Sequence, residues 1–197
     1  NTANYPRLKT DMFFDDFNKE ISFNGFIDNS IRYIEDFQLL DGELWARFVQ
    51  QFNEDSDFDA GWRGEYWGKM MRGAAMTYAY TKNEKLYSVM AKTVEDMINS
   101  ADEDGRISTY AKNHEFDGWD MWSRKYVMLG MQYFLEICTD SDFNEKIVES
   151  MKKQADYIIA RIGAEDEGKM PITSATRHWR GLNSCSVLEP IVRLYNI

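Results

Sequence analysis

Apolar residues recur every three or four positions along much of this chain, which is the period of one face of an α-helix. Two segments show the pattern clearly. The first stripe comprises Leu86, Val89, Met90, Val94, Met97 and Ile98. The second comprises Ile147, Val148, Met151, Ala155, Ile158 and Ile159. Lys and Glu fill the positions between them, so we predict two amphipathic helices with solvated outer faces.

An internal repeat leads into these two helices. "WRGEYWGKMMRGAAMTYAYT" begins at Trp62, and "WDMWSRKYVMLGMQYFLEICT" begins at Trp119, 57 residues later. Gly73 and Gly130 fall at the same offset. Glycine inside a helix costs about 1 kcal/mol relative to alanine, so we expect close helix approach at both glycines. Short polar turns, "KNEK" and "DSDFNEK", then join each segment to the amphipathic helix that follows.

The rest of the chain also reads as helical. "SIRYIEDFQ" and "GELWARFVQQF" predict shorter helices, and a third unit opens at "GLNSCSVLEPIVRLYNI". Proline removes a backbone hydrogen bond inside a helix, so we place Pro190 in a first turn with Glu189 beside it. Hairpins of about 60 residues stack into a solenoid or close into an α/α toroid. We predict one all-α domain over residues 1–197, with the aromatic-rich first helices on the inner ring and the Lys- and Glu-rich second helices outside.

The net charge and the composition of the chain limit the classes of partner that it is expected to bind. The net charge of −10 argues against nucleic acid, which is bound by Lys and Arg clusters. No apolar run approaches the roughly 20 residues of a membrane span, so no membrane partner is expected. The two cysteines and two histidines lack zinc-like spacing, so we expect no metal site within this chain, and we predict that Cys138 is a buried small apolar residue. The first ten residues, "NTANYPRLKT", do not identify the cellular compartment, and a periplasmic or secreted location is slightly favoured.

The inner helices begin in clusters of rings and charges, and aromatic residues make up 15% of the chain. In a toroid these helix starts share one rim, so their side chains converge on one pocket. Trp and Tyr faces suit sugar rings, while carboxylates, Lys and Arg suit hydroxyl groups. The predicted substrate-binding residues are Trp62, Glu65, Tyr66, Lys69, Tyr110, Trp119, Asp120, Trp122 and Lys125. The segment with His178, Trp179 and Arg180 leads into the third unit in the same way.

Cleavage of a glycosidic bond usually needs two carboxylates. Glu65, Glu115, Asp117 and Asp120 are the acids available at these entrances, and we predict Glu65, Asp117 and Asp120 as the catalytic candidates. A structural role is the alternative, because helix dipoles and caps also favour acids at helix starts. Lys69 and Lys125 either extend outward along the surface or point into a wet cavity.

Four ordered motifs, "WRGEYWGKMMRGAAMTYAYTKNEKL", "DGRISTY", "WDMWSRKYVMLGM" and "SCSVLEPIVRLY", resemble the N-terminal part of glycoside hydrolase family 127, the β-L-arabinofuranosidase group. The resemblance implies an (α/α)6 barrel, of which this chain is the N-terminal half. It also implies a retaining hydrolase with a cysteine nucleophile beside zinc, in sequence later than this chain. Cys138 and Cys185 do not match the nucleophile motif, so zinc is expected only of a longer protein. Trp119 and Arg124 stand where the family often carries His, so the resemblance does not identify which sugar is bound.

We therefore predict a glycoside hydrolase acting on side chains of plant- or microbe-derived polysaccharides, with this chain supplying part of the substrate pocket. We expect a fragment that pairs with the rest of a barrel or self-associates. One alternative is another α/α-toroid glycosidase or a polysaccharide lyase with its acids in this chain. A second is a carbohydrate-binding module without catalysis, and a third is a scaffold for a protein partner.

Overall fold

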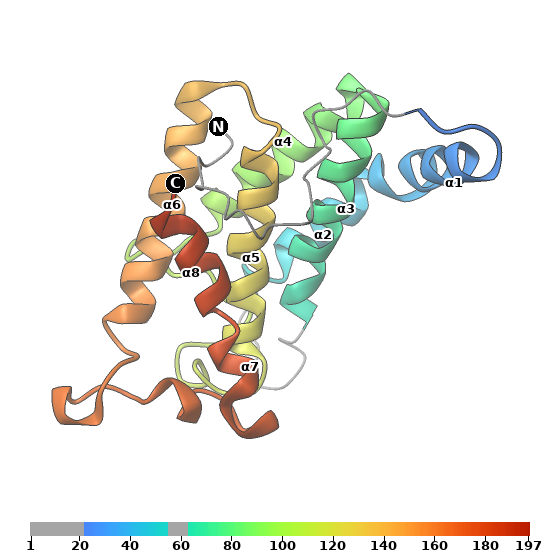
Figure 1. The fold of residues 1–197 in the computed structure, drawn as a ribbon. Helices are drawn as coiled ribbons and strands as arrows, with labels where there is room; N and C mark the ends of the chain where they lie inside the picture. Colours follow the sequence, from blue (N-terminus) through green and yellow to red (C-terminus); the bar gives the residue numbers. More distant parts are fainter. Residues whose placement is uncertain (1–21, 55–62) are drawn as a thin grey trace, which may run out of the picture.

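The computed structural model describes residues 22–54 and 63–197, and over these ranges the regular structure is helical (Figure 1). The only strand-like pairing there is an isolated bridge between Ile162 and Met170. The helices are α1 (Phe26–Ile34), continued by a π-helical turn (Glu35–Leu39), α2 (Gly42–Gln50), α3 (Glu65–Thr81), α4 (Glu84–Asn99), α5 (Asp120–Leu135), α6 (Ser141–Ile159), α7 (Leu182–Cys185) and α8 (Leu188–Tyr195). Short 3-10 turns (Glu165–Glu167, Ile172–Ser174 and Trp179–Gly181) connect α6 to α7. The all-α prediction is confirmed.

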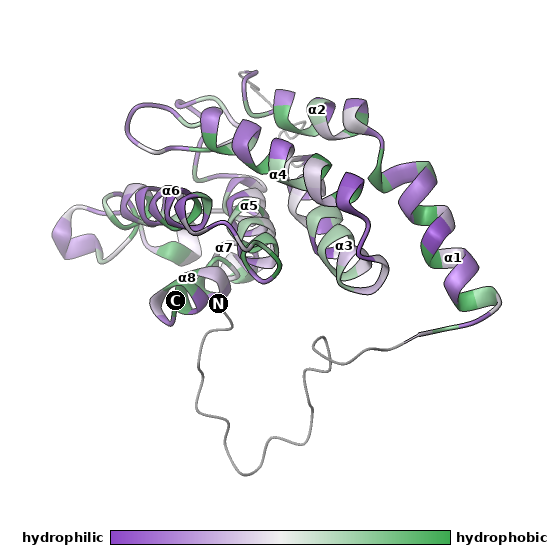
Figure 2. Cartoon of the chain, turned by 90° about the horizontal axis from the view of Figure 1, so that it is seen from above, coloured by the Kyte–Doolittle hydropathy of each residue, from purple (hydrophilic) through white to green (hydrophobic). Residues whose placement is uncertain are grey.

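The helices form the predicted hairpins, α3 with α4 and α5 with α6. Helices α3 and α5 both begin at their lower ends in Figure 1, and α7 lies below the start of α5. Seen from above, α3 and α5 stand in the middle, with α2 and α4 on one side and α8 on the other (Figure 2). None of the helices in the described part of the chain is long and apolar enough to cross a membrane.

Two capping residues fix where the outer helices begin. The Asn83 side chain accepts a hydrogen bond from the Lys85 amide at 3.0 Å, ahead of α4. The Asp140 carboxylate accepts from the amides of Asp142 and Phe143 at 3.0 and 3.1 Å. Because this cap satisfies free amides of the first turn, α6 begins at Ser141. The polar turn expected over residues 140–146 is therefore wrong beyond Asp140.

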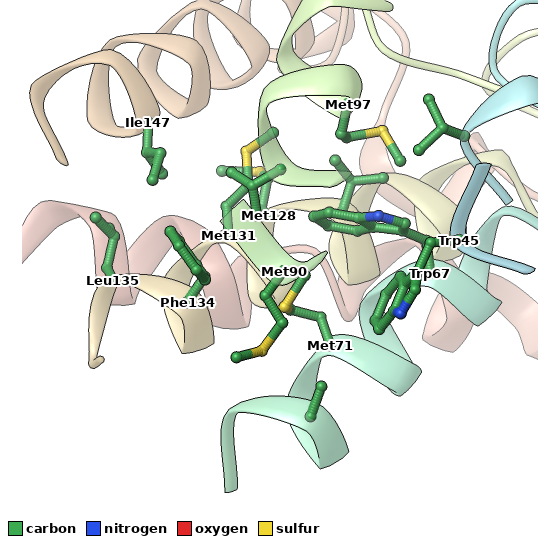
Figure 3. Packing of buried hydrophobic residues seen from close by; sticks show 14 of the residues in the cluster. Trp45, Trp67, Met71, Met90, Met97, Met128, Met131, Phe134, Leu135 and Ile147 are labelled. Carbon is green, nitrogen blue, oxygen red and sulfur yellow. The ribbon is translucent and has the colours of Figure 1, made fainter. Parts of the chain in front are cut away.

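One apolar core joins the hairpins to α2 (Figure 3). Trp45 and Trp67 lie in it, and their indoles donate to the Leu39 carbonyl at 2.8 Å and to the Thr93 hydroxyl at 2.9 Å. The predicted stripe of α4 lies on this core throughout, whereas Ile159 at the end of the α6 stripe is half exposed. Cys138 is buried as predicted, just beyond the last residue of α5.

Helices α3 and α5 approach each other most closely at two glycines. A Cβ added to Gly130 would lie 3.0 Å from the Gly68 Cα and 2.6 Å from the Trp67 ring. A Cβ on Gly68 would lie 1.8 Å from the Tyr126 carbonyl oxygen. The expectation for Gly130 is confirmed, but the one for Gly73 is wrong, because a Cβ there meets no atom within 4 Å. Gly68, one turn earlier, is the contact glycine of α3.

Candidate functional site

Four aromatic rings meet where α5 and α7 begin. The imidazole of His178 stacks on Trp119 with centroids 4.7 Å apart and planes at 18°. Trp179 stands edge-on to Trp119 at 5.0 Å and to Trp122 at 5.9 Å. We call Trp119, Trp122, His178 and Trp179 the rim cluster. Trp179 is 58% exposed, so the cluster presents an aromatic face to solvent.

Charged side chains border the rim cluster on the side of α3 and α8. The Glu65 carboxylate accepts a hydrogen bond from the Trp122 indole nitrogen, and its Oε2 lies 3.0 Å from the Lys69 Nζ. The Lys125 Nζ lies 4.9 Å from the Trp122 ring centroid and 3.3 Å from the Glu189 Oε2. The aromatic rings of the rim cluster therefore lie beside ion-paired side chains. This arrangement suits a ligand that is both ring-shaped and polar.

The segment before α7 is held against the start of α5 by side chains. The Thr176 hydroxyl donates to the Gly118 carbonyl at 2.7 Å, and the Asn183 amide donates to the same oxygen at 3.3 Å. Arg177 makes two hydrogen bonds to Asp117, at 3.0 and 2.5 Å. The Arg177 guanidinium holds the pKa of Asp117 below its usual range, so this carboxyl group is ionised near neutral pH.

Two features of this segment point to function. Trp179 and Arg180 adopt left-handed backbone conformations with φ of 54° and 52°. Such conformations are uncommon outside glycine and tend to gather at functional sites. The His178 Nε2 atom is buried and makes no hydrogen bond among the described residues. A buried polar atom without a partner is costly, so the unpaired Nε2 of His178 is the second unusual feature of this segment.

Asp120 belongs to a buried ionic network below the rim cluster. Its carboxylate accepts from the Ser108 hydroxyl at 2.6 Å and the Phe116 amide at 2.8 Å, and from the Arg124 Nε at 3.0 and 3.1 Å. Asp120 has no exposed surface. This arrangement ties the loop of residues 100–119 to α5, which is the structural role considered for Asp120 above.

Glu115 is the second acid of the network. It lies 2.8 Å from both the Arg106 Nε and the Arg124 Nη2, and it accepts from the Tyr157 hydroxyl at 2.7 Å. Burial opposes the charge of Arg124, but Asp120 and Glu115 outweigh it, so the pKa of Arg124 is raised. Burial and the bond to Glu115 raise the pKa of Tyr157 to about 12. Arg124 therefore stays charged, and the Tyr157 hydroxyl stays protonated, over the physiological pH range.

The structure brings together five of the predicted residues: Glu65, Lys69, Trp119, Trp122 and Lys125. Tyr66 lies apart, with its ring 5.9 Å from that of Phe48 on the α2 side. Tyr110 is buried, and its hydroxyl accepts from the Trp119 amide at 3.0 Å. Trp62 lies outside the described residues. Their binding roles stay predictions.

Sequence reasoning missed Tyr126, whose ring lies 5.3 Å from that of Trp122. The signal was available, because Tyr126 stands four positions after Trp122 and therefore on the same helix face. It also missed Arg177, since nothing in the sequence links residue 177 to Asp117. His178 and Trp179 were placed at the entrance of the third unit, on the same rim, but were not among the predicted substrate-binding residues.

Two hollows of the described structure lie away from the rim cluster. One of about 300 Å³ lies between α2 and α4, and one of about 270 Å³ lies between the last turns of α3 and α5. Within residues 22–54 and 63–197, no group of three or more His, Cys, Asp or Glu side chains is placed to hold a metal ion. The zinc ligand set implied by the family resemblance therefore finds no counterpart in the described part of the chain.

Comparison with known proteins agrees with the sequence motifs. The family model described as "Beta-L-arabinofuranosidase, GH127 catalytic domain" matches residues 15–184. No curated protein and no solved structure matches the chain. The matched range contains both described hairpins and the rim cluster.

Proposed function

The chain belongs to the β-L-arabinofuranosidase (GH127) catalytic-domain family, and from that membership we propose that its rim cluster forms one wall of the sugar pocket of a glycoside hydrolase. The observation that carries the proposal is the exposed ring of Trp179, held edge-on against Trp119 and Trp122. Aromatic side chains supply large, rigid contact area. Their faces suit the C–H groups on one side of a sugar ring.

The polar neighbours support the same role. A sugar hydroxyl both donates and accepts, and the rim offers an acceptor in Glu65 and donors in Lys69 and Lys125. Buried polar groups shaped to a hydroxyl discriminate strongly against ligands that lack it. The pocket wall therefore combines an apolar platform with several directional contacts.

Among the three candidate acids, Glu65 fits a role toward substrate best. It is the one that touches the rim cluster directly, through the Trp122 indole. Asp117 is engaged by Arg177 and is ionised, so it is unsuited to donate a proton near neutral pH. The Asp120 carboxylate is fully buried and is hydrogen-bonded to Ser108, Phe116 and Arg124. We propose that Glu65 orients a sugar hydroxyl, with the ion pair to Lys69 holding its carboxylate in place.

A binding experiment on this chain tests the proposal. Titration calorimetry with a β-L-arabinofuranosyl disaccharide is expected to detect binding, and Trp179→Ala is expected to weaken it at least about 10-fold. Tyr195→Ala is the matched control, because Tyr195 is 89% exposed and lies at the far end of α8. Equal affinities for wild type and Trp179→Ala would contradict the proposal, provided that both proteins show the same thermal unfolding midpoint.

A further inference from the structure

The hollow between the last turns of α3 and α5 lies well away from the rim cluster. Tyr133, which lines it, follows Trp122 on α5 by three turns, which is about 16 Å along a helix that rises about 1.5 Å per residue. The hollow has a volume of about 270 Å³. Since a water takes about 30 Å³, this space has the size of a single sugar unit.

Small side chains on α3 leave this space open. Ala75 and Ala79 stand four positions apart, so they lie on the same face of the helix, and both line the hollow. Tyr78 on α3 and Tyr133 on α5 line it as well. Methyl groups and aromatic rings therefore form an apolar lining, which suits the C–H groups on one side of a sugar ring.

Polar side chains complete the lining. Lys82 at the end of α3 offers hydrogen-bond donors, the Glu136 carboxylate offers acceptors, and the Thr139 hydroxyl offers both. All three residues are exposed, so they lie where the hollow meets solvent. One cation and one anion offset each other, which favours an uncharged ligand whose groups both donate and accept. Sugar hydroxyl groups have this property.

The backbone of Lys82 is a second, independent sign of a ligand site. Lys82 ends α3 in the left-handed conformation, with φ of 54°, and its amide donates to the Tyr78 carbonyl at 2.8 Å. Glycine is the usual residue at such a helix end, because it carries no Cβ. Other residues in this conformation tend to gather at functional sites. Here the Lys82 Nζ lies 5.9 Å from the Tyr78 ring centroid, beside the hollow.

From this geometry we infer that the hollow between α3 and α5 is a second carbohydrate site, which binds one neutral sugar unit. The C–H groups of the sugar contact the alanine methyl groups and the tyrosine rings, and its hydroxyl groups bond to Lys82, Glu136 and Thr139. The inference depends on the lining of this hollow alone, so it goes beyond the proposed function and does not require the rim cluster to bind sugar.

NMR of the methionine methyl groups tests the inference at the hollow itself. Met76 lines the hollow and is 37% exposed, whereas Met170 is 40% exposed and lies in the segment between α6 and α7. Titration with L-arabinose is expected to shift the Met76 methyl signal and to leave the Met170 signal in place. The Met76 shift should persist in Trp179→Ala, because the rim cluster is a separate site.

Lys82→Gly distinguishes a binding role from a structural one. The variant should unfold at a higher temperature than wild type, because glycine adopts the left-handed conformation without strain. It should nevertheless bind L-arabinose about 10-fold more weakly, as expected when one hydrogen bond from a charged group is lost.

Filling the hollow should abolish binding. Ala79→Leu places a larger side chain in the hollow between α3 and α5. The matched control is Ala46→Leu, which fills the hollow between α2 and α4 instead and should bind L-arabinose as wild type does.

Three results overturn the inference. They are an unmoved Met76 signal in wild type, a Met76 shift that disappears in Trp179→Ala, and unchanged affinity in both Lys82→Gly and Ala79→Leu. None of them decides the proposed function, which is tested by calorimetry with the β-L-arabinofuranosyl disaccharide and Trp179→Ala.

Discussion

Gly68 and Gly130 face each other where α3 and α5 meet, and the Gly68 Cα lies 3.0 Å from the point that a Gly130 Cβ would occupy. The two helices can approach this closely only because neither residue has a side chain. Close approach brings the helix starts together, so that Glu65 at the start of α3 reaches the Trp122 indole on α5. Backbone packing in mid-helix therefore sets the geometry of the rim.

Gly68→Ala is expected to destabilise the protein, while Gly73→Ala in the same helix is not. A Cβ at Gly68 would collide with the Tyr126 backbone, so we expect a loss of more than about 3 kcal/mol, beyond ordinary overpacking. Gly73 has open space, and alanine there should raise stability by up to about 1 kcal/mol through helix propensity. Urea unfolding of both variants measures the difference, and equal effects would show that the close approach is absent.

Removing the charge of Glu115 should also destabilise the fold. Glu115→Gln leaves Arg106 and Arg124 without their shared carboxylate in a buried site, and breaking a buried pair costs about 3–5 kcal/mol. The control is Glu149→Gln, whose partner Lys152 is exposed on α6 and whose loss should cost under about 1 kcal/mol. Thermal unfolding of the two variants separates the cases, and similar midpoints would mean that the network contributes little.

The helices could be predicted because their apolar period is strong and their hairpins repeat. Positions that depend on tertiary contacts could not. Gly73 and Gly68 look alike in the sequence, and only the crossing point of α3 and α5 distinguishes them. The start of α6 was misplaced because the polar run that suggested a turn begins with the Asp140 cap and then enters the helix.

The candidate site was predicted in part for the same reason. The 57-residue repeat placed Glu65 and Trp122 at equivalent positions, and the structure joins them by a hydrogen bond. In the sequence, Asp120 looks like an acid of the rim cluster, because it is an acidic residue at the start of a helix. Its burial depends on how the loop of residues 100–119 folds back onto α5, which local pattern does not encode.

The Asp117–Arg177 pair predicts a specific pH dependence. The pKa of Asp117 lies below its ordinary value of 3.8, chiefly because Arg177 donates to the ionised form. A lowered folded-state pKa stabilises the protein above the unfolded value, and this contribution is lost as the pH falls through the folded pKa. Arg177→Gln should therefore be less stable than wild type at pH 6, and the difference should shrink as the pH falls below 3.8.

NMR titration of side-chain carboxyl groups checks the same pair directly. In Arg177→Gln the pKa of Asp117 should rise toward 3.8, while that of Asp28, which is lowered by Tyr80 and Arg32, should stay low. An unchanged pKa for Asp117 would mean that Arg177 does not hold this carboxylate in solution.

Asp120→Asn and Glu65→Gln are expected to affect different properties. Asparagine at position 120 offers one acceptor where the carboxylate accepts from Ser108, Phe116 and Arg124, so unfolding should become easier by about 3 kcal/mol. Glutamine at position 65 keeps an acceptor for the Trp122 indole and loses an ion pair with a lysine that is 44% exposed, which should cost under about 1 kcal/mol. Thermal unfolding and titration with the β-L-arabinofuranosyl disaccharide separate the two roles. Weak sugar binding by Asp120→Asn at wild-type stability would instead assign Asp120 to the pocket.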